Sequence, residues 1–92
     1  MPYQITQYTR DQARKLGVVV KHSTNPNKKI DVFKNGEKIA SVGAIGYGDY
    51  PTFMRTRGKE YADEKRRLYK IRHSSDRNIR GTNGYYADKL LW

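Results

Sequence analysis

A β-hairpin is predicted by residues 29–42, which read Lys29-Ile30-Asp31-Val32-Phe33-Lys34-Asn35-Gly36-Glu37-Lys38-Ile39-Ala40-Ser41-Val42. The pair Asn35-Gly36 lies between two runs typical of β-strands, and a two-residue type I′ turn needs positive φ at both of its central positions. Asn and Gly adopt such φ values more readily than other residues. Because side chains alternate along a strand, Ile30 and Val32 are expected on the same face of the first strand.

A short helix and a further strand are expected before this hairpin. The run Thr9-Arg10-Asp11-Gln12 matches a capping box, in which Thr9 caps the helix and Gln12 bonds back to it. Gly17 is expected to end the helix, since glycine adopts the left-handed conformation that closes many helices. Val18-Val19-Val20 is β-branched and predicts the start of a strand that can join the hairpin.

After the hairpin the chain is expected to be mainly helical. Three glycines between residues 43 and 48 predict an irregular loop, and Pro51 suits the first position of a helix. A long helix is predicted from there to about His73, with an interruption at Gly58. Its expected buried face carries Phe53, Tyr61, Leu68 and Ile71, opposite Arg55, Lys59, Arg66 and Lys70. Residues 74–84 predict a loop, and residues 85–92 predict a helical segment that packs on the long helix or on the hairpin.

Residues 1–92 therefore predict a single small basic α+β domain: a short N-terminal helix, a β-hairpin or small three-stranded antiparallel sheet, a long basic helix and a C-terminal helical segment. A net charge of +10 alone is typical of disorder, but eight Tyr, two Phe and one Trp favour a folded chain. The absence of cysteine excludes disulfide scaffolds and thiolate zinc sites. No apolar run approaches the roughly 18–20 residues of a membrane span, and no secretory signal is expected.

A basic segment is the first candidate binding surface. Residues 55–80 hold ten lysines and arginines and four acidic residues. Such density is typical of proteins that bind polyanions, where each neutralised phosphate releases counterions. The alternative is a solvated helix face whose charges pair along the helix, but the net charge favours an acidic partner. The candidate polyanion-binding residues are Arg55, Lys59, Arg66, Arg67, Lys70, Arg72, Arg77 and Arg80.

Three aromatic residues, Tyr47, Tyr50 and Trp92, are candidates for partner binding. Aromatic side chains on a glycine-rich loop can stack on bases or fill a pocket of a partner protein. They can equally pin the loop to its own core, which is the favoured interpretation for Tyr50, whereas both are open for Tyr47. The glycine-rich segment itself is interpreted as a turn, because no Gly-Lys-Ser/Thr follows it as in a phosphate-binding loop.

Catalysis has little support in the sequence. His22 and His73 are the only histidines. His73 precedes Ser74, Ser75 and Asp76, an arrangement that could serve a phosphodiesterase, but such residues in a loop are more often surface polar groups. No second histidine stands at metal-ligand spacing. The sequence therefore predicts a protein that is not an enzyme, with no catalytic residue, metal, cofactor or small-molecule substrate; a small nuclease is the third alternative.

Several short motifs, taken together, resemble a known family. They are Leu16-Gly17-Val18, Asp31-Val32-Phe33, Gly46-Tyr47, Asp49-Tyr50-Pro51-Thr52, Arg66-Arg67-Leu68-Tyr69-Lys70-Ile71-Arg72-His73 and Gly84-Tyr85-Tyr86-Ala87-Asp88-Lys89-Leu90-Leu91-Trp92. The chain is similar, from about residue 8 to residue 92, to small basic proteins encoded by nucleo-cytoplasmic large DNA viruses, including algal viruses.

The resemblance implies a virion component, either a minor capsid protein or a protein beside the genome. Such a protein would join larger parts of the particle through its basic helix and its aromatic anchors. Its expected partners are viral capsid proteins or DNA, and acidic surfaces in general. Its expected location is the virion, and the host cytoplasm or nucleus during infection. The alternative is a sequence-independent nucleic-acid-binding protein that contacts phosphates.

Overall fold

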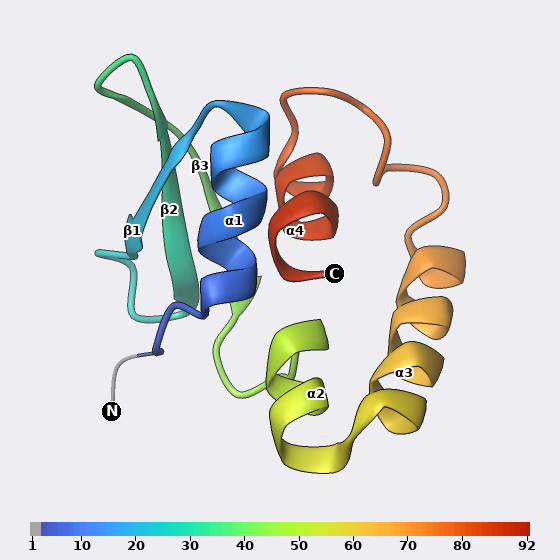
Figure 1. The fold of residues 1–92 in the computed structure, drawn as a ribbon. Helices are drawn as coiled ribbons and strands as arrows, with labels where there is room; N and C mark the ends of the chain where they lie inside the picture. Colours follow the sequence, from blue (N-terminus) through green and yellow to red (C-terminus); the bar gives the residue numbers. More distant parts are fainter. Residues whose placement is uncertain (1–2) are drawn as a thin grey trace.

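The structure is a computed structural model that describes residues 3–92, and these residues form four helices and a three-stranded sheet (Figure 1). The elements are α1 (Gln7–Leu16), β1 (Val19–His22), β2 (Lys28–Lys34), β3 (Glu37–Ala44), α2 (Tyr50–Arg57), α3 (Lys59–Arg72) and α4 (Asn83–Leu91). The sheet is antiparallel, with the order β1-β2-β3. The predicted α+β fold is confirmed, and the strand before the hairpin does join the sheet.

The hairpin forms at the predicted turn. Asn35 and Gly36 have φ values of 54° and 80°, as a type I′ turn requires. Lys34 pairs with Glu37 beside the turn, and the register shifts at Val32, where β3 carries a bulge opposite β2. Ile30 and Val32 are both fully buried, so they share one face as the alternation predicts, and that face is the one turned toward the core.

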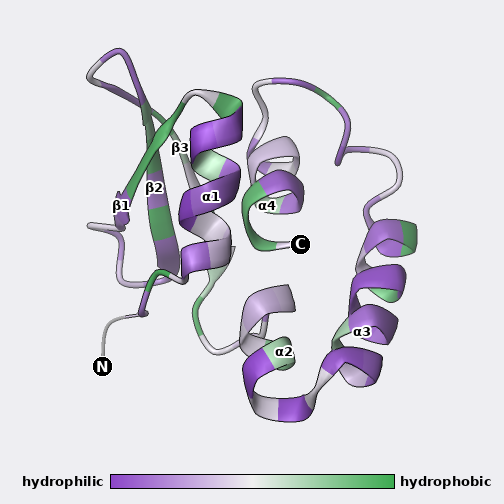
Figure 2. Ribbon diagram, in the orientation of Figure 1, coloured by the Kyte–Doolittle hydropathy of each residue, from purple (hydrophilic) through white to green (hydrophobic). Residues whose placement is uncertain are grey.

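The hydrophobic core lies between the sheet and the helices α1 and α4, and we call these elements together the body. Its buried side chains come from the sheet, the two helices and the segments next to α1; they are Ile5, Ala13, Val18, Val20, Ile30, Val32, Ala40, Val42, Tyr86, Leu90 and Leu91. Figure 2 shows hydrophobic residues along β1 and β2 and at the end of α4, and mainly hydrophilic residues along α3. The C-terminal helix therefore packs on the hairpin, one of the two places expected for it.

The predicted capping box of α1 is wrong. Thr6, not Thr9, is the N-cap, and its hydroxyl oxygen accepts a hydrogen bond from the Thr9 amide at 3.3 Å. Thr9 is fully buried and donates its hydroxyl to the Leu90 carbonyl at 2.8 Å, while Gln12 donates to the Lys89 carbonyl at 3.0 Å. Both side chains satisfy carbonyls in the last turn of α4, which have no partner within that helix. No local pattern in α1 reveals partners so far along the chain.

The helices α2 and α3 form a second unit, residues 50–72, which we call the helical arm. Gly58, with φ of 93°, separates them, as the sequence predicts. The two helices pack against each other, and Ala62 of α3 is fully buried. Figure 1 shows the arm extending away from the sheet, with α3 on the far side of α4.

The predicted buried face of the long helix is wrong in its second half. Ile71 is 60% exposed, whereas Arg66 and Lys70 turn toward neighbouring helices. The Arg66 guanidinium lies 3.4 Å from the centre of the Tyr50 ring, and Lys70 Nζ lies 2.6 Å from a carboxylate oxygen of Asp88. These partners belong to other elements, so the periodicity of α3 alone does not show which face they attract.

The segment between α3 and α4 contains turns and no strand or α-helix over residues 73–82. Thr82 caps α4 by accepting a hydrogen bond from the Tyr85 amide at 3.2 Å. Across residues 3–92, none of the helices has the length and apolar composition needed to cross a bilayer.

Candidate functional site

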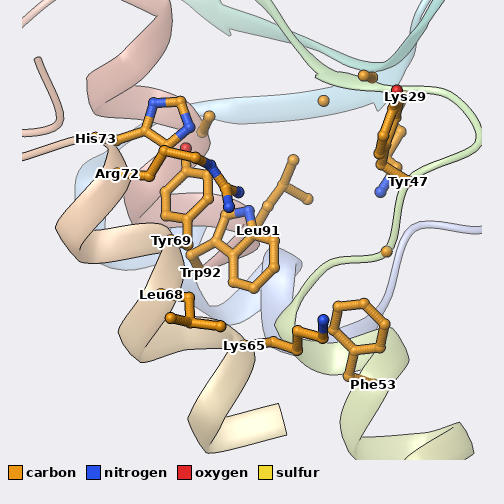
Figure 3. Close-up of a pocket in the computed structure, with 14 residues that line it drawn as sticks. Lys29, Tyr47, Phe53, Lys65, Leu68, Tyr69, Arg72, His73, Leu91 and Trp92 are labelled. Atoms are coloured by element: carbon orange, nitrogen blue, oxygen red, sulfur yellow. The ribbon is translucent and has the colours of Figure 1, made fainter.

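A cleft of about 600 Å³ separates the helical arm from the body. α3 supplies one side, the end of β3 and the loop after it supply the other, and the end of α4 lies between them (Figure 3). In Figure 3, Tyr47 stands on the loop side, whereas Tyr69, Trp92 and Arg72 stand on the α3 side. Two segments distant in sequence thus meet across one space.

Aromatic rings form a continuous row beside the cleft, and all of them except Tyr61 line it. Tyr61 and Phe53 have ring centroids 5.2 Å apart, Phe53 and Trp92 6.1 Å, Trp92 and Tyr69 4.5 Å, and Tyr69 and His73 4.3 Å. The Trp92 and Tyr69 planes differ by only 10°, so these two rings are stacked. Such contacts stabilise the row beyond the area that they bury.

Two cations project from α3 along this row. Lys65 Nζ lies 5.4 Å from the centre of the Tyr61 ring, and the Arg72 guanidinium lies 5.9 Å from that of Tyr69. Neither side chain forms an ion pair within residues 3–92. Lys29 also lines the cleft, but it is buried and its charge is neutralised by Asp49 at 3.0 Å.

No Asp or Glu belongs to the cleft lining within the described part of the chain. The charge in the cleft is therefore positive, and low-dielectric aromatic walls strengthen its effect on an anion.

Two glycines shape the loop side of the cleft. Gly43 has φ of 85°, and a Cβ there would lie 2.8 Å from a Leu91 methyl group and 2.9 Å from Lys29 Cδ. A Cβ on Gly48 would overlap the Phe53 ring. The first glycine allows β3 to approach α4, and the second leaves room for Phe53. The interpretation of the glycine-rich segment as a turn is consistent with this geometry.

A buried carboxylate fixes the α3 side of the cleft. Asp88 is 1% exposed and lies 2.6 Å from Lys70 Nζ, 3.1 Å from Lys89 Nζ and 3.7 Å from the Arg77 guanidinium. Burial alone would raise the pKa of Asp88, but hydrogen bonds from Lys70 and Lys89 and their charges hold that pKa below its usual value. The carboxylate is therefore ionised at neutral pH and binds α4 to α3.

Tyr69 is neutral under the same conditions. Burial, with the negative charges of Asp88 and Asp76, raises the pKa of Tyr69 to about 12. Its ring therefore presents an uncharged aromatic surface beneath Trp92.

The predicted polyanion-binding residues are not gathered on one face. Four of them form ion pairs: Lys59 with Asp63, Arg67 with Glu64, and Lys70 and Arg77 with Asp88. Arg66 stacks on Tyr50 and donates to the Tyr8 hydroxyl at 3.3 Å. Arg72 lies in the cleft, and Arg55 and Arg80 are exposed elsewhere. Of the eight, only Arg72 adds charge to the cleft.

The three predicted partner-binding aromatics have different surroundings. Tyr47 is 76% exposed and lines the cleft, and Trp92 lines it from the opposite side. Tyr50 is 9% exposed, donates its hydroxyl to Asp63 at 2.9 Å and packs against Tyr8. These contacts support the interpretation favoured for Tyr50, in which its ring pins its segment to the rest of the protein, over a role for it in partner binding.

Sequence reasoning did not assign Phe53, Lys65 and Tyr69 to a site, and it considered His73 only for the nuclease alternative. Lys65, Tyr69 and Arg72 are spaced by four and three residues, which places them on one face of a helix. That spacing is a signal the sequence does contain. The position of Trp92 against this face and that of Tyr47 across the cleft from it come from the tertiary fold and have no such signal.

His73, the candidate of the nuclease alternative, stacks on Tyr69 and has its Nδ1 atom 3.5 Å from an Asp76 carboxylate oxygen. Residues 3–92 contain no group of three or more His, Cys, Asp or Glu side chains that could hold a metal ion. The prediction that the protein is not an enzyme stays a prediction.

Comparison with known proteins gives no relative: no family model, no curated protein and no solved structure matches this chain. The resemblance to the viral family therefore stays a prediction as well.

Proposed function

We propose that this protein binds nucleic acid without sequence specificity and without changing it chemically. The observation that carries the proposal is the cleft, which combines a row of aromatic rings with Lys65 and Arg72 and has no acidic side chain in its lining. Nucleic acids present the two matching features, flat bases and negative phosphates.

The physical basis is the sum of two weak interactions. Bases stack on aromatic side chains whatever their identity, and lysine and arginine contact the backbone phosphates. Binding of the second kind releases counterions and weakens as salt rises. The net charge of +10 adds a general attraction that speeds association.

A role in a virus particle is the second candidate, and it rests on the resemblance. The observation in its favour is that large hydrophobic side chains, Tyr47, Ile71 and Ile79, are 76%, 60% and 54% exposed and could anchor a capsid protein. A protein packed beside a genome would combine both candidates. Location in the virion, or in the host cytoplasm or nucleus, is part of this second proposal.

Salt-dependent binding of a labelled oligonucleotide tests the first proposal. We expect fluorescence anisotropy to show binding that weakens steadily between about 50 and 300 mM salt. The double variant Lys65→Gln/Arg72→Gln should bind at least about fivefold more weakly. The negative slope of log affinity against log salt should become shallower by about one to one and a half, because fewer counterions are released.

The matched control is Lys15→Gln/Lys34→Gln, which removes the same charge from exposed side chains outside the cleft. It should keep most of the affinity. Equal losses in the two variants would show that the attraction is diffuse and that the cleft is not the site. No binding at about 50 mM salt would refute nucleic-acid binding altogether and leave the capsid role as the better candidate.

A further inference from the structure

We propose that the cleft holds an unpaired base of a single strand between Tyr47 and the stacked pair Trp92–Tyr69, so that the protein prefers single strands to duplexes. This inference rests on the proposed nucleic-acid binding and names the form of nucleic acid that the cleft accepts. Its tests below are chosen so that the two ideas can fail separately.

Tyr47 stands at the mouth of the cleft and is the most exposed of the large hydrophobic side chains that the structure describes. Its side chain is 76% exposed and, within residues 3–92, it forms no side-chain hydrogen bond and no aromatic or cation–π contact. It lies between Gly46, with φ of 93°, and Gly48. A large aromatic side chain held open to water at the mouth of a cleft is available to pack on a ligand.

The side of the cleft that faces Tyr47 is held in place by stacked rings. Trp92 is stacked on Tyr69, and Tyr69 in turn on His73, with centroid distances of 4.5 and 4.3 Å. The Lys70–Asp88 ion pair holds the helix that carries Tyr69 against the helix that precedes Trp92. An ordered platform loses little entropy when a flat group stacks on it, which favours binding.

Two cations of α3 are placed to contact the phosphates of a bound strand. Lys65 and Arg72 are seven residues apart on α3, which corresponds to about 10 Å along the helix axis. Both side chains are long and lie on the same face as Tyr69. They can therefore reach the phosphates on either side of a base that sits against Trp92.

A base within a duplex does not fit this cleft. In a duplex, neighbouring base pairs cover both faces of each base, and only the edges are open in the grooves. A cleft walled by rings offers stacking and needs a base face, which an unpaired, splayed base provides. A volume of about 600 Å³ lies within the usual range for sites that enclose a small molecule.

Trp92 provides a direct test, because it is the only tryptophan in the chain. We would titrate the protein at about 100 mM salt with a thymidine single strand of about 12 nucleotides, a blunt duplex of the same length and thymidine monophosphate. We expect the single strand to quench Trp92 fluorescence and to bind at least about tenfold more tightly than the duplex.

Variants of Tyr47 then test its part in the cleft. Tyr47→Ala should weaken single-strand binding about tenfold and leave duplex binding unchanged, whereas Tyr47→Phe should keep the wild-type affinity. Because Tyr47 is exposed, neither change should disturb folding. Ile71→Ala, at an exposed residue of α3 outside the cleft, is the matched control and should have no effect.

The outcomes separate the two proposals. Salt-dependent binding that is equal for single strand and duplex, without quenching of Trp92, would overturn the cleft inference and leave nucleic-acid binding standing. Binding of the monophosphate as tight as that of the strand would overturn it in favour of a free-nucleotide site. Absence of binding by every probe would refute both.

Discussion

Asp88 joins the helical arm to the body through a buried carboxylate near the end of α3. Its carboxylate is 1% exposed, and three cations from the α3–α4 region surround it: Lys70, Arg77 and Lys89. These cations keep contact with water, since the exposed fractions of their side chains are 29%, 29% and 33%. The three positive charges attract the Asp88 carboxylate, and the cations lose only part of their hydration because they stay partly exposed. Both effects favour the ionised form of Asp88.

Asp88→Asn should therefore be strongly destabilising. It removes the charge that compensates the three cations, and breaking a buried pair costs about 3–5 kcal/mol. Because the cations here are partly hydrated, we expect a decrease of about 2–3 kcal/mol in the free energy of unfolding, measured by urea denaturation.

Glu64→Gln is the matched control, since the Glu64–Arg67 pair is exposed on both sides. Its effect should stay below about 1 kcal/mol. An effect of Asp88→Asn no larger than that of Glu64→Gln would show that the Asp88 cluster does not hold the joint.

The buried aspartates also predict how stability depends on pH. Burial alone would raise the pKa values of Asp31, Asp49 and Asp88, but hydrogen bonds to each carboxylate outweigh burial and lower all three. The unfolded chain then takes up protons at about pH 3.9, before the folded chain does. Protons therefore favour unfolding, and the stability from these groups is present above about pH 4 and lost as pH falls below it.

Urea denaturation at several pH values checks this. The midpoint should change little between pH 7 and about 5, then fall steeply below about 4. The fall should be shallower in Asp88→Asn, which lacks one of the titrating groups. A wild-type midpoint that stays constant down to pH 3 would contradict the lowered pKa values.

At the scale of elements, α1 and α4 are joined by side chains that finish each other's hydrogen bonds. Thr9 and Gln12 donate to the carbonyls of Leu90 and Lys89, at the end of α4. A helix end that is buried without such partners is costly, because its last carbonyls have no intrahelical donor. The position of α4, and with it that of Trp92 in the cleft, thus depends on α1.

Thr9→Val tests this dependence, because valine keeps the shape of threonine and removes the hydroxyl. The Leu90 carbonyl would lose its buried donor, and we expect a loss of about 1–3 kcal/mol in thermal or urea denaturation. Thr6→Ala, which removes the N-cap of α1, should cost about 1 kcal/mol. If Thr9→Val were neutral, water would have to reach the Leu90 carbonyl in its place.

The elements also show what the sequence could predict. The hairpin turn, the C-terminal end of α1 and the break between α2 and α3 are encoded locally, by Asn35-Gly36, Gly17 and Gly58, and each lies where the sequence predicts it. The orientation of α3 could not be predicted from its own sequence, because the groups that attract Arg66 and Lys70 lie on α2 and α4.

The same distinction applies to the site. Arg72, Tyr47 and Trp92 could be selected by residue type and exposure, and all three line the cleft. The arrangement of these three residues around one cleft could not be predicted, because it depends on how the arm folds back against α4. The Trp92–Tyr69 stack joins the residue after α4 to a residue of α3, and no spacing in either segment indicates it.

At the scale of the whole molecule, the core belongs to the body, and the arm contributes nothing to its central cluster of buried side chains within residues 3–92. Two buried carboxylates hold the arm at its ends. Asp49 caps α2 while bound to Lys29 and Tyr3, and Asp88 binds Lys70 near the end of α3. The arm should therefore open at lower cost than the body, and the width of the cleft should depend on these two joints.

Hydrogen–deuterium exchange can measure this difference. Regions outside a shared core open with less free energy than the core itself, so the amides of α3 should exchange faster than those of β2 and β3. Lowering the pH from about 4 toward 3 should widen the difference, after correction for the intrinsic exchange rate, because carboxylates released by opening take up protons there before those in the closed joints do. Adding the single strand should slow exchange in α3 and in the loop around Tyr47 and leave β1 unchanged, since β1 lies outside the cleft. Exchange that is equally slow in arm and body without ligand would show one cooperative unit and would remove the basis for an adjustable cleft.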